Sequence, residues 1–221
     1  NGFNPVAPAT EEESRTSLWN PKDQTFLGGA LRYDLGGDRF IRYSINGFDE
    51  EVRNLGAMRR PQFKPYAFDD YYRTRRMDHA LQQEGSLGKN FYLQTTAGYN
   101  RFRRIKNTYR LDFETEEQNE VPSEQDTTRF NTWMLRPVLA SKFAESKLNF
   151  QLGLDLRYEN GFGQRIQDET SDRENYSEQG DYALFGSLQY EPTERLSMQA
   201  GARIAHNTRY EAPVTPSFNL K

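Results

Sequence analysis

The chain has 221 residues, of which 35% are hydrophobic, 28% charged and 14% aromatic, and its formal net charge is -3 at pH 7. The absence of cysteine excludes a disulfide scaffold and thiolate metal sites, and the slightly acidic balance gives no indication of a nucleic-acid partner. A mean hydropathy of -0.97 is low for a compact soluble domain, whereas the aromatic content argues against disorder. The polar residues are therefore expected to be arranged by a regular fold.

Alternation of apolar and polar residues along most of the chain predicts β-strands, and no stretch has the pattern of an amphipathic helix. Residues 1–24 are expected to be a loop or linker. The predicted strands follow in chain order: 25–34, 39–48, 73–84, 91–113, 128–143, 147–159, 180–190 and 195–206, with a ninth beginning near Ser217. This pattern predicts an all-β fold.

Short and long connections alternate between these strands. The short ones, LGGD, GSLGKN, AES and EPTE, have the composition of tight hairpin turns. The long ones are polar and cover residues 49–72, 114–127, 160–179 and 207–216. Outer-membrane barrels have short turns at the periplasmic end and long extracellular loops. The alternation therefore favours an antiparallel up-and-down meander that is part of a transmembrane β-barrel.

The segment KLNFQLGLDLRYE, residues 147–159, has the clearest alternation of apolar and polar residues, and it raises the question of what the apolar side faces. One side of an extended chain would carry Leu148, Phe150, Leu152, Leu154, Leu156 and Tyr158, and the other would carry Asn149, Gln151, Gly153, Asp155, Arg157 and Glu159. The apolar side could pack on a soluble core or face lipid around a barrel with a wet lumen. The chain contains no run of about 18 apolar residues, so no membrane-spanning helix is predicted, but barrel strands need no such run.

Residues 180–190 support the barrel interpretation. Their apolar side would place Tyr182 and Tyr190 at the two ends of a band, as an interfacial aromatic girdle does. In 195–206 the opposite side, with Gln199 and Arg203 among its residues, would point into a polar lumen. Phe185 on the expected lumen side and Pro137 inside a strand do not fit the pattern, and Pro137 suggests a local bulge or edge.

Several blocks of the sequence resemble the barrel region of TonB-dependent outer-membrane receptors of Bacteroidetes-type Gram-negative bacteria. They are SINGFDEEVRNLG, YNRFRRIKNTYRLDFETEEQ, QDTTRF and DYALFGSLQYEPTERLSMQAGARIAHNTRYEAPVTPSFNLK. The resemblance covers most of residues 25–221 and implies a membrane protein of the cell outer membrane. Members of this family have a plug domain, a TonB-contacting segment and about 22 barrel strands. Neither plug nor contact segment is recognised here, and both chain ends are expected to be cut, so residues 1–221 are interpreted as a fragment of about eight strands.

The resemblance implies a transport function for the parent protein. Such a receptor takes up a scarce extracellular ligand, such as a ferric siderophore, haem, cobalamin or an oligosaccharide, with energy supplied by TonB through the plug. The expected partners are outer-membrane lipid, TonB and that ligand, with no nucleic acid and no cofactor. No catalytic constellation is present, so an enzyme is not expected. The alternatives are a soluble or surface all-β module that binds a ligand, and an outer-membrane barrel without energy coupling.

Ligand recognition is expected in the loops at 49–72, 114–127 and 160–179. Their aromatic residues are the candidate ligand-binding set: Phe63, Tyr66, Phe68, Tyr71, Tyr72, Phe162 and Tyr176.

Three further groups of residues are candidate binding sites. His79 and His206, expected at or near strand ends, could ligate haem but are more simply solvated or lumen residues. The loop carboxylates Asp168, Asp172 and Glu174 could hold Ca²⁺, but they lack the glycine of a calcium loop. The basic run RFRRIK at 101–106 is expected to pair with carboxylates on neighbouring strands.

Overall fold

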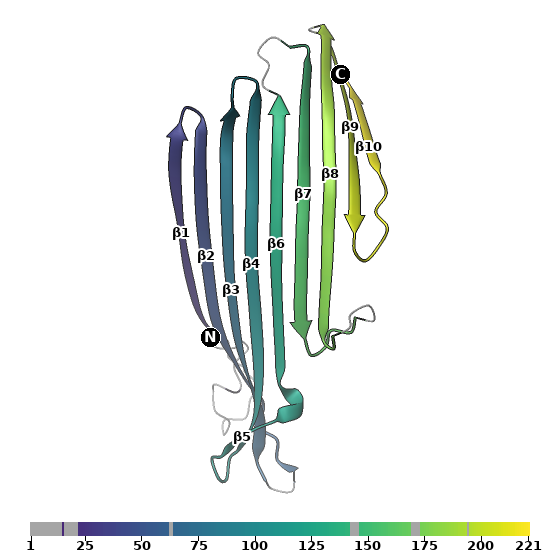
Figure 1. The fold of residues 1–221 in the computed structure, drawn as a ribbon. Coiled ribbons are helices and arrows are strands. Elements are labelled where there is room, and N and C mark those ends of the chain that lie inside the picture. Colours follow the sequence, from purple (N-terminus) through teal and green to yellow (C-terminus); the bar gives the residue numbers. More distant parts are fainter. Residues whose placement is uncertain (1–14, 16–21, 62–63, 142–145, 169–172, 194) are drawn as a thin grey trace.

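The computed structural model describes residues 15, 22–61, 64–141, 146–168, 173–193 and 195–221, and these form one sheet of ten antiparallel strands (Figure 1). The order in the sheet is β1-β2-β3-β4-β6-β7-β8-β9-β10, and the short β5 pairs with β4. The predicted all-β antiparallel meander is confirmed. Within the described ranges, no helix is both long and apolar enough to cross a membrane.

Apart from the three-residue β5, which pairs with β4 alone, each strand is hydrogen-bonded to the strands before and after it in this order. Their bounds are Lys22–Gly36 (β1), Arg39–Leu55 (β2), Tyr66–Leu87 (β3), Phe91–Asp112 (β4), Gln118–Glu120 (β5), Asp126–Ser141 (β6), Leu148–Gly163 (β7), Tyr176–Thr193 (β8), Leu196–Asn207 (β9) and Thr215–Leu220 (β10). All eight predicted strands are present, and β10 is the strand expected near Ser217. The strand β5 and the 3-10 helix η2 (Pro122–Glu124) have no counterpart among the predicted elements.

The two ends of the sheet differ as the loop lengths predict. Strands joined by short connections, β1 with β2, β3 with β4, β6 with β7 and β8 with β9, meet at the upper end of Figure 1, here called the short-turn end. The long connections leave from the opposite, long-loop end. In the first hairpin Gly36 and Gly37 both have positive φ, 91° and 67°, a combination that strongly favours glycine.

At the long-loop end the strands extend further than predicted. Residues 49–72, expected to be a loop, contain the last part of β2 and the first part of β3, with Leu55 opposite Asp69. Ion pairs hold this ribbon together: Arg75 Nε lies 2.6 Å from Asp49 Oδ2, and Arg73 lies 3.5 Å from Glu51 Oε1. Both faces are polar here, so the alternation that reveals a strand is missing from the sequence.

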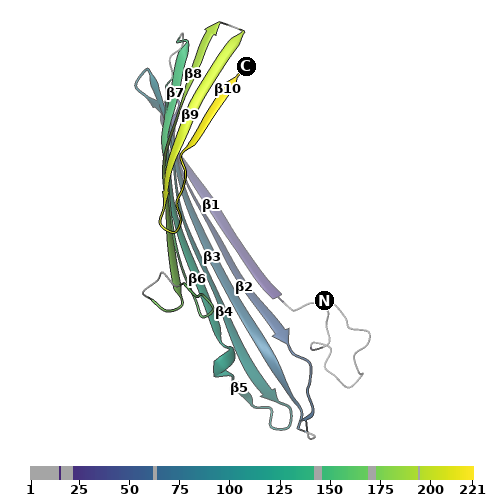
Figure 2. The same ribbon diagram turned by 90° about the vertical axis from the view of Figure 1, so that its right-hand side faces the viewer.

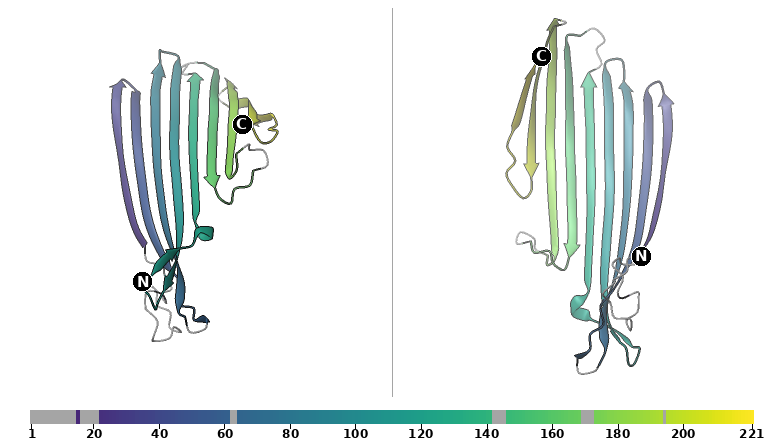
Figure 3. Two further views of the ribbon diagram at one scale, coloured as in Figure 1. Left: turned by 60° about the horizontal axis from the view of Figure 1, so that its bottom comes forward. Right: turned by 180° about the vertical axis from the view of Figure 1, so that it is seen from behind.

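The sheet is a single curved layer (Figures 2 and 3). Every pair of described elements in contact is a pair of sheet neighbours or β4 with η2, so no described element packs on either face. Ala67 and Ala183 are the buried hydrophobic residues of the described chain, whereas Leu152 and Leu188 are 47% and 54% exposed. The described part therefore has no internal core of the kind that a soluble sandwich requires.

The strand register sorts the side chains onto two faces. The face that carries Leu152, Leu156 and Leu184 is here called the apolar face. One row of directly opposed residues crosses it from β1 to β9: Leu31, Tyr43, Leu81, Ala97, Leu135, Leu156, Tyr182 and His206. The predicted division of residues 147–159 into an apolar and a polar side matches this register.

The other side, here called the polar face, carries charged and amide side chains that bind one another. Arg203 on β9 lies 3.0 Å from Asp155 on β7, and Arg76 lies 3.0 Å from Asp78 on β3. The ring of Phe185 lies over Gly153 on the neighbouring strand, in space that a larger residue at 153 would fill. A glycine opposite Phe185 thus accommodates the aromatic residue that did not fit the sequence pattern.

Pro137 also has a local explanation. It lies opposite Thr95 on β4, but the pairing between β6 and β7 is interrupted at Arg136 and Pro137 and resumes at Val138. Proline has no N–H to donate to a neighbouring strand. The register is the same on both sides of this gap, with Leu135 opposite Leu156 and Val138 opposite Gly153, so the bulge or edge predicted at Pro137 is wrong and only the local pairing is missing.

Candidate ligand-binding site at the long-loop end

The predicted aromatic set is placed mainly on strands, and the expectation of loop positions is wrong for most of it. Tyr66, Phe68, Tyr71 and Tyr72 belong to β3, because the strand begins at Tyr66. Two others lie at strand ends at the long-loop end, Phe162 in β7 and Tyr176 at the start of β8. Phe63 lies outside the described residues.

The set is also divided between the two faces. Alternation along β3 puts Tyr66, Phe68 and Tyr72 on the polar face and Tyr71 on the other side. Phe162 and Tyr176 are directly opposite each other on the side of the apolar face. The structure therefore does not bring the six described residues of this set into one site.

Arginines cover several of these rings. The guanidinium carbon of Arg110 lies 4.6 Å from the centroid of Tyr66, and that of Arg104 lies 4.7 Å from the centroid of Tyr72. Cation–π contacts of this kind are favourable and hold the arginine near the ring. In the sequence, these arginines are visible as the basic run RFRRIK and as Arg110, which follows it on β4.

One cleft on the polar face combines an aromatic ring with unpaired cations. It has a volume of about 420 Å³, and its lining residues come from β3, β4, β6 and the β7–β8 connection: Tyr72, Arg104, Lys106, Asp126, Thr128 and Arg165. This set is here called the cationic cleft. Arg104 and Arg165 are exposed, and neither forms an ion pair with the described residues.

Lys106 and Asp126 complete the cleft chemistry. The Lys106 ammonium lies 3.4 Å from Asp70 and 3.8 Å from Glu124, so its charge is already balanced. Asp126 is directly opposite Lys106 in the register, and its Oδ1 is buried without a hydrogen-bond partner among the described residues. A buried acceptor without a donor is costly, and a ligand hydroxyl, an amine or water would satisfy it.

The predicted loop 114–127 is folded against β4 beside the cleft. The Gln125 amide donates to the carbonyls of Thr108 (2.8 Å) and Val121 (2.9 Å), and its oxygen accepts from the Thr108 N–H at 3.3 Å. The Thr108 hydroxyl donates to Asp70 Oδ1 at 2.6 Å. These bonds fix the segment that leads into Asp126 and so position one wall of the cleft.

A buried ion pair anchors Arg15 at the same end. Its guanidinium donates to both carboxylate oxygens of Asp69, at 2.5 and 3.0 Å, and to the Gly56 carbonyl at 3.2 Å. The two side chains are 4% and 2% exposed. Residue 15, predicted to be loop or linker, therefore contacts the sheet.

Neither histidine is placed as a metal ligand. His79 lies within β3, not at a strand end, and its Nδ1 is 2.6 Å from the Tyr43 hydroxyl. His206 lies near the end of β9. Asp168 is bound by both terminal nitrogens of Arg209, at 2.8 and 2.5 Å, and Asp172 lies outside the described residues. In the described part of the chain no three histidine, aspartate or glutamate side chains form a metal-binding group.

The expectation that RFRRIK pairs with carboxylates is wrong for Arg101 and Arg103. Arg103 lies between Arg75 on β3 and Arg129 on β6, and Arg101 lies between Met77 and Asn131. Only the register decides which residues are opposed, and the sequence does not reveal it.

Comparison with known proteins identifies the fold class. No family model matches the chain, and no curated protein matches it. The RagAB peptide importer in its open-open state has 9% identity and a TM-score of 0.55 over 90% of this chain and 29% of its own. The siderophore receptor PirA from Pseudomonas aeruginosa has 12% identity and a TM-score of 0.49 over 89% of this chain and 36% of its own. The outer-membrane transporter YddB from Escherichia coli has 9% identity and a TM-score of 0.47, over 92% of this chain and 36% of its own.

The chain is thus an open antiparallel sheet of outer-membrane-barrel type. It spans about a third or less of the length of these solved chains. At such identities the similarity concerns the fold alone. It rests on the RagAB importer, for which the TM-score is 0.55. At that level, the resemblance to part of a TonB-dependent receptor barrel is confirmed.

Proposed function

We propose that the chain is part of the barrel of a TonB-dependent outer-membrane transporter, with the apolar face against lipid and the polar face toward the lumen. The observation that carries the proposal is the exposed apolar face itself. In water, an open sheet with Leu184, Leu188 and Phe218 at 46%, 54% and 67% exposure would aggregate. In a bilayer the same side chains lie in their preferred solvent.

Aromatic rings border the apolar face at two levels, as the girdles of an outer-membrane barrel do. Tyr99, Trp133 and Tyr158 form a row of rings toward the long-loop end, and Phe91 and Phe150 lie 6.1 Å apart toward the short-turn end. Along β7, Phe150 and Tyr158 are separated by about 26 Å at a rise of about 3.3 Å per residue. Barrel strands tilt by about 35–45°, so this length corresponds to roughly 20 Å across the membrane, somewhat less than the lipid-facing band of about 25 Å between the aromatic girdles of outer-membrane barrels.

The cationic cleft supports uptake of a ligand that carries negative charge. Arg104 and Arg165 supply positive charge without a counter-ion among the described residues, and Tyr72 offers a flat surface beside them. The unpaired Asp126 oxygen adds one acceptor for a donor group of the ligand. An anionic ferric siderophore or haem fits this chemistry better than cobalamin or a neutral oligosaccharide.

Uptake by the full-length protein tests this proposal. Cells that carry it would be supplied separately with ferric siderophores, haem, cobalamin and oligosaccharides, with and without a working TonB. We expect TonB-dependent uptake of an anionic ligand, weakened about tenfold or more in affinity by Arg104→Ala with Arg165→Ala. Arg32→Ala, which removes an exposed arginine of β1, is the matched control. Uptake without TonB, or equal uptake by all variants, would contradict the proposal.

The alternative of a soluble or surface binding module predicts a different distribution. Such a protein would be recovered from the aqueous fraction, whereas the transporter is recovered with the outer membrane. Fractionation of the full-length protein distinguishes the two.

A further inference from the structure

Two arginines of the polar face, far from the cationic cleft, have no counter-ion among the described residues. The register runs across one level of this face from Arg42 on β2 through Gln82 and Thr96 to Arg136 on β6. Both arginine side chains are exposed, and neither forms a hydrogen bond or an ion pair with the part of the chain that the structure describes. Arg42 and Arg136 are here called the inner arginines.

The inner arginines lie at the depth of the apolar band on the opposite face. On β4 their level passes through Thr96, which lies between Phe91 and Tyr99, the residues of the two aromatic levels. Arg104 of the cationic cleft is about 26 Å further along the same strand, at a rise of about 3.3 Å per residue. Ionisable residues in a membrane-spanning part commonly face a wet interior and mark the pathway of a substrate.

The carboxylate that would balance Arg136 is bound elsewhere. Asp155 would be opposite Arg136 if the pairing of β6 with β7 were continuous at this position. Instead, Asp155 lies 3.0 Å from Arg203 on β9. The guanidinium carbon of Arg136 lies 5.4 Å from the centroid of the Phe185 ring, a contact that supports the side chain but leaves its charge unbalanced.

Arg42 is in the same situation on the other side of this level. It is directly opposite Arg32, and the Arg32 Nε lies 2.9 Å from Asp34. Another nearby carboxylate, Glu84, accepts a hydrogen bond from the Tyr92 hydroxyl at 3.0 Å. Like charges directly opposite each other destabilise a sheet. An anion from outside the described residues would therefore stabilise Arg42.

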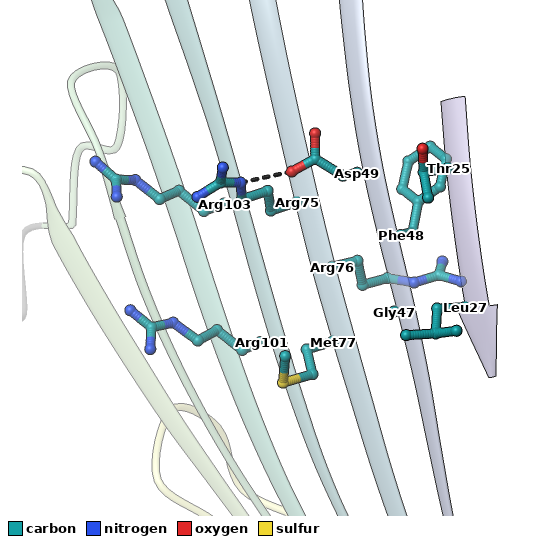
Figure 4. A pocket seen from close by; sticks show the side chains of 10 residues that line it. All are labelled: Thr25, Leu27, Gly47, Phe48, Asp49, Arg75, Arg76, Met77, Arg101 and Arg103. Carbon is teal, nitrogen blue, oxygen red and sulfur yellow. Dashed lines mark hydrogen bonds and ion pairs between the residues drawn. The ribbon is translucent and has the colours of Figure 1, made fainter. Parts of the chain in front are cut away.

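The cations between the two levels are balanced. Arg76 lies 3.0 Å from Asp78, and Arg157 lies 2.5 Å from Glu159. Figure 4 shows Arg76 extending in the opposite direction to Arg101, which belongs to the other side of the sheet. An anion that moves along the polar face from the cationic cleft thus meets its next unbalanced positive charge at the inner arginines.

We propose that the inner arginines form a transit site for the anionic ligand, which reaches them after it leaves the cationic cleft. This inference rests on the proposed function, because it requires the polar face to line the lumen. The strands β2 and β6 are three spacings apart, about 14 Å, and the small residues Ala80 and Gly98 lie between the two arginines, one step toward the cleft. A ligand with acidic groups on two sides can bind both guanidinium groups by charge-assisted hydrogen bonds. Such a site speeds passage through the lumen without adding to the affinity of the cleft.

Uptake by cells that carry the full-length protein tests this inference. The probes are a radiolabelled ferric tris-catecholate siderophore and radiolabelled haem. The dissociation constant is measured in cells without a working TonB, and the maximal uptake rate per receptor in the outer membrane is measured in cells with it. We expect Arg42→Gln with Arg136→Gln to lower the maximal rate about tenfold and to leave the dissociation constant unchanged. Arg42→Lys with Arg136→Lys is the matched control, because it keeps both charges, and it should retain most of the rate.

Three results would overturn the inference. The first is a wild-type uptake rate in the glutamine variant, and the second is an equal loss of rate in the glutamine and lysine variants. The third is faster uptake in the glutamine variant together with sensitivity to a large antibiotic that the outer membrane normally excludes, which would show that the inner arginines hold the plug of the parent protein.

Failure of this inference is distinguishable from failure of the proposed function. If Arg104→Ala with Arg165→Ala weakens binding as expected and the glutamine variant transports normally, only the transit site is wrong. If neither probe shows TonB-dependent uptake by the wild type, the proposed function and the transit site fail together.

Discussion

The ring centroids of Tyr99 on β4 and Trp133 on β6 lie 5.2 Å apart on the apolar face, where the two residues are directly opposite each other. Tyr158 on β7 continues the contact at 5.6 Å from Trp133, and His79 lies 5.9 Å from Tyr99 on the other side. Toward the short-turn end the face is mainly apolar, and toward the long-loop end it carries Arg101 and Arg103. On the proposed membrane placement, this row marks the boundary between lipid and water.

The depth of Trp133 follows from this position. In a variant of the full-length protein that keeps Trp133 as its one tryptophan, with Trp19→Phe and any tryptophan outside residues 1–221 also replaced, we expect quenching by lipids brominated near the headgroup to exceed quenching by lipids brominated near the acyl-chain end. Trp133 in a soluble protein would be quenched by neither, and it would instead be accessible to aqueous iodide.

Asp69 should control access to Arg15. In Asp69→Asn the guanidinium loses its buried carboxylate, and breaking such a pair costs about 3–5 kcal/mol of stability. We expect faster tryptic cleavage after Arg15 and a lower Tm of the full-length protein. Asp34→Asn, which breaks an exposed pair with Arg32, serves as control and should change neither. An unchanged cleavage rate in Asp69→Asn would show that the pair does not anchor residue 15.

Gly56 should be intolerant of a side chain. A Cβ at this position would collide with the Phe68 carbonyl on the neighbouring strand β3, and the Gly56 N–H donates to that same oxygen at 3.0 Å. Since backbone cannot swing away as a side chain can, Gly56→Ala should open the ribbon between β2 and β3. Hydrogen exchange of the amides near Phe68 would rise, whereas Gly29→Ala, with nothing near its Cβ, should leave exchange unchanged.

The stability of the turn after β4 should depend on pH. The Glu114 N–H and then the Thr115 N–H donate to Asp112 Oδ1, at 2.9 and 3.3 Å, and hold the pKa of Asp112 below its ordinary value of 3.8. A depressed pKa contributes stability that is complete above the ordinary value and is lost as pH falls through the folded value. Amide protection of Glu114, corrected for intrinsic exchange, should fall in that acid range. In Asp112→Asn, which cannot titrate, the acid-range loss should disappear.

The sequence predicted the faces of β7 and β8 correctly because one side of each strand is aliphatic, so the period of two is visible. The same signal fails past Tyr99 and Trp133, where charged residues such as Arg73 and Asp49 lie on the side of the sheet that is apolar elsewhere. From the sequence alone, the ends of β2 and β3 therefore resemble loops, and Tyr66 and Tyr72 are predicted as loop residues. The row of Arg75, Arg103 and Arg129 could not be predicted either, since the residues opposite Arg103 are set by register across three strands.

The lipid contact of the apolar face is tested most directly by introducing a charge at two adjacent positions of β7. Leu152→Arg in the full-length protein places a cation on the apolar face, where it should cost about 2–4 kcal/mol and impair membrane assembly. Gln151→Arg places the same cation on the polar face and should assemble normally. Equal assembly of both variants, with a probe at position 152 that reports water, would contradict the account.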